Sequence, residues 1–166
     1  RKRRLDIGFL FGAHLVSGLK FQVLRHERLV CVLPRDHPLA DEPSIDLTSL
    51  AGEPCVMGGA SAWHTFIEIV DTFCMAAGFR PRVIQEAAHS DGIVNLVAAG
   101  VGVTMYVDAE WLRTRPDVVV RPFIQEVPPM TSVVAWHPDA ASKAIRNFIE
   151  AADEMVRAQD GHREGR

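Results

Sequence analysis

Residues 89–106, HSDGIVNLVAAGVGVTMY, constrain the fold more than any other stretch of the chain. Apolar residues recur at helical spacing through the first half, where Ser90 or Asp91 can cap the helix and Gly100 can end it. Residues 101–106 form a short, β-branched run bounded by glycine, which favours a buried strand. This pattern is one half of a βαβ unit. Because ligands of open α/β sheets lie against helix N-termini at the carboxyl edge of the strands, the start of this helix is the first candidate ligand-contacting edge.

The rest of the chain alternates between strand and helix patterns. Short apolar runs predict strands at 5–10, 27–34, 55–57, 82–86, 118–123 and 132–136. Helical spacing predicts a long helix that Ser61 caps and Gly78 ends, a final helix capped by Asp139, and two short helices capped by Ser44 and Asp108. Alternation of this kind predicts an α/β fold with mainly parallel sheets.

Two proline-bearing breaks divide the chain. They lie near residues 34–43 and at 128–129, and they bracket a middle block with its own strands and helices. We therefore expect a first lobe at 1–34, a second lobe at 35–128, a return to the first lobe at 129–158 and a disordered tail at 159–166. A lobe inserted into another lobe is typical of a hinged, cleft-binding domain.

Composition narrows the function classes. The apolar runs are shorter than the roughly 18 residues that span a bilayer, and no signal peptide is visible, so we expect a cytoplasmic chain with no membrane partner. The formal net charge is -3, and residues 1–4 are the one dense basic run, which we interpret as a solvated terminus. The three cysteines, Cys31, Cys55 and Cys74, lie in apolar contexts that favour buried free thiols.

Enzyme motifs are absent from the sequence. It holds no G-x-S-x-G elbow, P-loop, G-x-G-x-x-G or H-E-x-x-H, and none of its seven histidines has a cysteine at zinc-ligand spacing. We therefore expect no cofactor, no metal and no catalytic residues.

Several segments carry a family resemblance through their order and spacing: LDIGF at 5–9, ERLVCVLPRDHPLA at 27–40, IDL at 45–47, LAG at 50–52, AGF at 77–79, Pro81, QE at 85–86 and LVAAGVGV at 96–103. Over most of residues 5–157 the chain resembles the LysR-type transcriptional regulators.

The resemblance implies the C-terminal effector-binding domain of such a regulator, with a type 2 periplasmic-binding-protein fold of two Rossmann-like lobes joined by a two-segment hinge. Such regulators sense a small metabolite between the lobes, as a homodimer or tetramer on promoter DNA. The helix-turn-helix and the opening part of the first lobe are absent from this sequence. We thus expect an incomplete first lobe, and DNA contact only through an N-terminal domain. The alternatives are a solute-binding lobe of a transport system and a small α/β enzyme.

The resemblance also implies a ligand site. Its matching positions are the loop at Phe11 and Gly12, the loop with Gly58, Gly59 and Ser61, the helix start at His89, Ser90 and Asp91, and the strand end at Tyr106 and Asp108. Helix N-termini offer free N–H groups and a positive dipole end, which attract a small carboxylate or aromatic acid.

Other interpretations of these residues stay open. Ser61 and Ser90 can each be a ligand contact or only an N-cap. Asp91 and Asp108 would repel an anion, so either both point away or the ligand carries a donor group. We expect His64 and His89 to be surface histidines, and the three tryptophans to pack.

Overall fold

The computed structural model describes residues 5–11, 18–128, 130–140 and 142–163, and it divides the chain into two compact units. Unit 1 consists of Arg1–Glu27 with Met130–Arg166, and unit 2 is Arg28–Pro129. The chain therefore passes between the units twice, once after Glu27 and once after Pro129. Among the described helices, none is long and apolar enough to cross a membrane.

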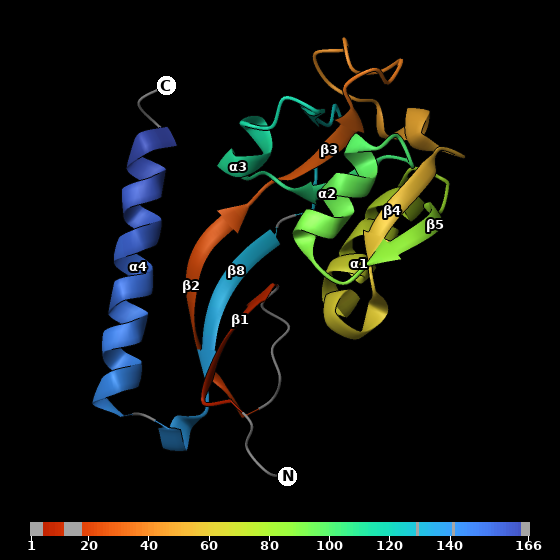
Figure 1. Cartoon of the computed structure of the whole chain (residues 1–166). Helices are drawn as coiled ribbons and strands as arrows, with labels where there is room; N and C mark the ends of the chain where they lie inside the picture. Colours follow the sequence, from red (N-terminus) through yellow and green to blue (C-terminus); the bar gives the residue numbers. More distant parts are fainter. Residues whose placement is uncertain (1–4, 12–17, 129, 141, 164–166) are drawn as a thin grey trace. The chain divides into compact units, whose positions relative to one another are not determined.

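In its described residues, unit 1 is an antiparallel sheet with helix α4 beside it (Figure 1). The strand order is β1-β8-β2, with β1 at Ile7–Phe11, β2 at Lys20–Glu27 and β8 at Met130–Trp136. The central strand is the most buried, since Val133 and Val134 are fully enclosed. Helix α4, Lys143–Arg163, packs Ile145 and Ile149 against Val134, so these two side chains face the sheet.

Both ends of α4 differ from the prediction. Asp139 lies in a separate 3-10 turn, Pro138–Ala140, and Ser142 accepts a hydrogen bond at 3.3 Å from the backbone N–H of Ile145. The helix continues to Arg163, so the predicted disorder is wrong for residues 159–163.

Unit 2 holds two sheets. One is antiparallel with the order β6-β3-β7, and the other is the parallel pair β4-β5. Their bounds are β3 Leu29–Pro34, β4 Pro54–Gly58, β5 Arg82–Ala87, β6 Thr104–Val107 and β7 Val118–Pro122. The expectation of mainly parallel sheets is wrong, because a strand's direction depends on which distant strands become its neighbours.

The predicted strand at 27–34 is in fact two strands that belong to different units. β2 ends at Glu27 in unit 1, and β3 begins at Leu29 as the fully buried centre of the unit 2 sheet. The first-lobe boundary therefore falls after Glu27 instead of after residue 34. Sequence patterns missed β2 because its residues alternate irregularly between half-buried and exposed positions.

The helices of unit 2 end as predicted but start differently. They are η1 Leu47–Leu50, α1 Ala60–Ala76, α2 Ser90–Ala98 and α3 Glu110–Arg113. Gly78 and Gly100 follow α1 and α2 with positive φ angles of 89° and 76°, which glycine adopts without steric cost. The caps are Asp46, Gly59, His89 and Ala109, so the predicted caps Ser44, Ser61, Ser90, Asp91 and Asp108 are wrong.

The core of unit 2 lies between α2 and the buried strands. Its buried members include Val32, Val56, Val94 and Tyr106. All three cysteines are buried and free, as expected from their apolar contexts.

Candidate functional site

Two helix N-termini meet at one edge of unit 2 because the strands before them are parallel neighbours. Gly58, the last residue of β4, pairs in register with Ala87, the last residue of β5. The backbone N–H of Gly59 donates to the Ala87 carbonyl at 3.2 Å. One residue, Gly59, separates β4 from α1, and two residues, Ala88 and His89, separate β5 from α2. Both helices consequently begin at the same carboxyl edge.

Neither helix start is capped by a side chain. Gly59 and His89 are the N-caps of α1 and α2, and neither makes a side-chain capping hydrogen bond. The first N–H groups of a helix have no partner within the helix, and together they carry a partial positive charge. This edge of unit 2 therefore offers two sets of backbone donors to an anion or another hydrogen-bond acceptor.

A tyrosine from β6 completes this edge. The hydroxyl of Tyr106 donates a hydrogen bond of 2.6 Å to the Ser90 hydroxyl, in the first turn of α2. The Tyr106 ring is only 7% exposed and contacts the rings of Trp63, Phe66 and Trp111 at centroid distances of 5.9, 6.0 and 6.2 Å. Burial raises the pKa of Tyr106, the hydrogen bond with Ser90 lowers it, and the negative charge of Asp91 raises it; the net effect is a raised pKa, so the phenol keeps its proton at neutral pH.

Trp63, in the first turn of α1, contacts the chain at the ends of both strands that precede the two helices. Its indole Nε1–H donates to the Ala88 carbonyl at 3.2 Å, and its ring lies over Gly58. A Cβ atom on Gly58 would lie 2.1 Å from Trp63 Cγ, so only glycine fits beneath the ring. The indole also packs against the core of unit 2, as the helical stripe predicted.

The remaining predicted residues have different positions. Asp91 is exposed in the first turn of α2, and His89 is exposed as its N-cap. Asp108 accepts two hydrogen bonds from Arg113, at 2.9 and 3.0 Å, so this carboxylate is engaged by α3. Phe11 ends β1 in unit 1.

Seven of the predicted residues thus share one edge of unit 2: Gly58, Gly59, Ser61, His89, Ser90, Asp91 and Tyr106. Gly12 and the basic run at residues 1–4 lie outside the described residues.

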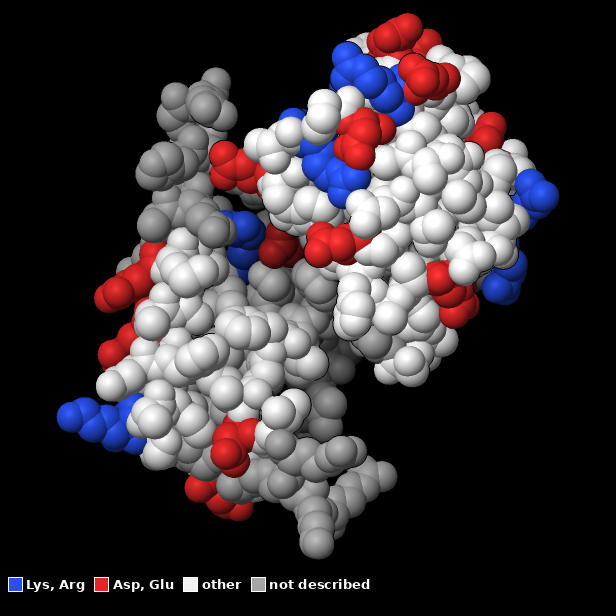
Figure 2. Space-filling view, in the orientation of Figure 1, with Lys and Arg blue, Asp and Glu red and all other residues white. Residues whose placement is uncertain are grey.

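Unit 2 also contains a polar hollow that sequence patterns did not indicate. Its volume is about 800 Å³, and its lining includes Arg35, His37, Arg113, Arg115 and Arg121. On the face of this unit that Figure 2 shows, charged groups of both signs stand next to one another. These arginines are scattered along the chain, so no local pattern could have grouped them.

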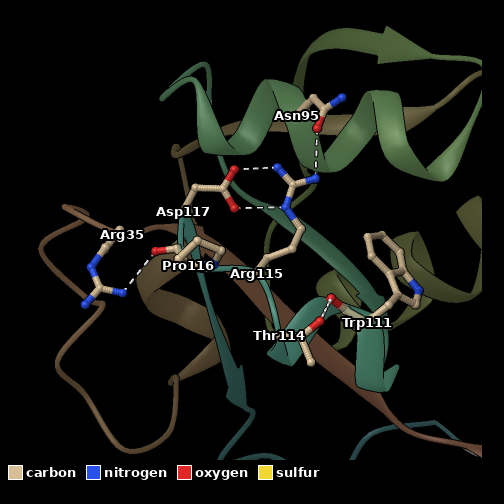
Figure 3. Close-up of polar contacts among 7 residues, drawn as sticks. All are labelled: Arg35, Asn95, Trp111, Thr114, Arg115, Pro116 and Asp117. Carbon is tan, nitrogen blue, oxygen red and sulfur yellow. Dashed lines mark hydrogen bonds and ion pairs between the residues drawn. The ribbon is translucent and has the colours of Figure 1, made fainter.

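The guanidinium groups around this hollow are occupied by structural contacts. Arg115 pairs with Asp117 and reaches the Asn95 side chain at 2.8 Å, and Arg35 donates to the Pro116 carbonyl at 3.0 Å (Figure 3). Through Asn95 and Arg35, these contacts hold the loop before β7 against α2 and against the end of β3. We therefore interpret the arginines as structural.

The family model of the LysR substrate binding domain matches residues 1–157. The chain belongs to this family. This LysR domain is 30% identical over 152 residues to the HTH-type transcriptional regulator AlsR of Bacillus subtilis (strain 168), covering 92% of this chain and 50% of the relative. It spans about half the length of the curated relatives it matches.

Solved structures share the fold of this LysR domain. The effector binding domain of QuiR in complex with shikimate superposes with a TM-score of 0.79 at 19% identity, covering 92% of this chain and 72% of that one. The BenM effector binding domain with its effector benzoate gives 0.73 at 22% identity, covering 95% and 74%. The predicted type 2 periplasmic-binding-protein-like α/β fold is confirmed. The relatives favour a regulator over a transport protein.

Proposed function

We propose that this LysR domain senses a small metabolite for a transcriptional regulator and binds it at the edge where α1 and α2 begin. The observation that carries the proposal is the pair of uncapped helix N-termini side by side on β4 and β5. A helix start without a capping side chain lacks the hydrogen bond that a Ser, Thr, Asn or Asp side chain would accept there, and a bound acceptor supplies it.

The chemistry of this edge favours a small carboxylate or an aromatic acid. Backbone N–H groups, the helix dipoles and the serine hydroxyls are suited to a carboxylate, and the rings of Trp63 and Trp111 supply apolar surface nearby. Asp108 is paired with Arg113, which reduces the repulsion that this aspartate would otherwise exert on an anion. The carboxylate of Asp91 would still repel an anion at this edge.

Signalling requires that the effector binds two conformations with different affinities, because a ligand with equal affinity for both shifts neither. We propose that this difference reaches DNA through an N-terminal domain in an oligomeric, cytoplasmic regulator, without catalysis. The contribution of Phe11 and Gly12 to the ligand site stays a prediction.

A thermal-shift screen with small carboxylates, aromatic acids and neutral metabolites tests the proposal. We expect at least one compound to raise the melting temperature of the chain, because a ligand that binds only the folded state stabilises it. If no compound of any class does so, the sensing function is wrong.

Ser90→Trp should abolish this shift, because an indole at the start of α2 covers the exposed backbone donors. Ser49→Trp is the matched control, since Ser49 is an exposed serine of η1. Unchanged affinity of the Ser90 variant in calorimetry would exclude this edge as the site.

A further inference from the structure

We propose that Tyr106 is a positioning residue that makes the Ser90 hydroxyl a donor, and thereby selects ligands that present an anionic oxygen acceptor. This inference deepens the proposed function and depends on it. It concerns how the edge distinguishes a carboxylate from a neutral group of the same shape.

The Tyr106 hydroxyl has a defined direction. Three rings, those of Trp63, Phe66 and Trp111, surround the tyrosine ring, and β6 holds its backbone. A buried phenol requires a hydrogen-bond partner, and here the partner is Ser90 at 2.6 Å. That distance lies within the usual range of about 2.5–3.0 Å for hydrogen bonds between hydroxyl groups.

The consequence for Ser90 follows from counting donors and acceptors. A serine hydroxyl has one hydrogen to donate and two lone pairs to accept with. Because Tyr106 fills one lone pair, the hydrogen of Ser90 must point to another acceptor. Hydrogen bonds in a chain polarise one another, so a hydroxyl that accepts from tyrosine is also a better donor.

Ser90 is placed to give this hydrogen to a ligand. It is half-buried rather than enclosed, it lies in the first turn of α2, and it does not serve as the helix cap. The backbone N–H groups beside it are donors too. A ligand group that contacts Ser90 and these backbone N–H groups must itself be an acceptor, and a carboxylate oxygen gains most because charge-assisted bonds are about twice as strong as neutral ones.

Calorimetry with benzoate, shikimate and succinate, each beside its primary amide, tests the inference on the full chain. We expect a carboxylate to bind more tightly than its amide. Tyr106→Phe should weaken binding of the carboxylate by about threefold to tenfold and binding of its amide by less. The reason is that the ring stays while the polarising hydroxyl is lost.

A double-mutant cycle separates positioning from packing. Ser90→Ala should weaken carboxylate binding by about tenfold or more, and adding Tyr106→Phe should then have no further effect, because tyrosine acts only through serine. Ser90→Thr keeps a hydroxyl and should retain the selectivity. Phe66→Leu is the packing control, since it alters a buried ring beside Tyr106 and should leave the carboxylate-to-amide ratio unchanged.

Each outcome decides the inference. Additive effects of the two variants, or an unchanged ratio in Tyr106→Phe, would overturn it while the sensing function stands. Binding of amides or other neutral metabolites alone would also overturn it and leave that function intact. If no compound of any class binds, the inference and the function are both wrong.

Discussion

Gly58→Ala probes the contact that places the two helix starts. The new Cβ would lie 2.1, 2.3 and 2.4 Å from Cγ, Cδ2 and Cδ1 of Trp63. Carbon atoms in contact are about 3.5–4.0 Å apart, so the indole must move by about 1.5 Å. Gly58 is not among the glycines with positive φ, so backbone strain adds nothing to this cost.

The magnitude follows from two losses. Overpacking of a well-packed site costs about 1–3 kcal/mol, and breaking the hydrogen bond from Trp63 to the Ala88 carbonyl costs about 1 kcal/mol. We expect Gly58→Ala to lower the free energy of unfolding by about 2–4 kcal/mol. Urea denaturation followed by circular dichroism should show a lower midpoint with an unchanged slope.

Two controls make the measurement specific. Gly8→Ala places a Cβ where no atom lies within 4 Å, so it should be neutral or slightly stabilising. In a Trp63→Ala background the obstructing ring is gone, and Gly58→Ala should cost less than about 0.5 kcal/mol. An equal cost with and without the indole would refute the reasoning.

Two further predictions concern the core of unit 2. Phe66→Ala should cost about 3–5 kcal/mol in urea denaturation, because Phe66 is 4% exposed and its removal leaves a cavity; a loss below about 1 kcal/mol would contradict this burial. Burial raises the pKa of Cys55 and of Cys74 from 9.0 to about 12, so the folded state holds these protons more tightly. The stability they contribute is present below pH 9.0 and is lost as the pH rises towards 12, so denaturation midpoints should fall across that range. The folded double variant Cys55→Ala/Cys74→Ala should show a smaller fall in midpoint over the same pH range.

Local sequence determined the elements whose signals are short-range. The helical apolar spacing in α1, α2 and α4 required one buried face, and Gly78 and Gly100 supplied the left-handed residues that end two of these helices. The β-branched run of β3 marked a strand buried on both faces. These features depend on residues within one or two turns of each other, so the sequence alone was sufficient.

The tertiary structure decided what depends on distant neighbours. Strand directions, the division of the segment around Arg28 between two units, and the meeting of Tyr106 with Ser90 are properties of chain paths that no local pattern records. The N-cap residues of α1 and α2 could not be predicted from the local sequence either. The paired strands β4 and β5 end at Gly58 and Ala87, and the helices begin so soon after them that Gly59 and His89 become the N-caps. Ser61 and Ser90 therefore lie inside the helices.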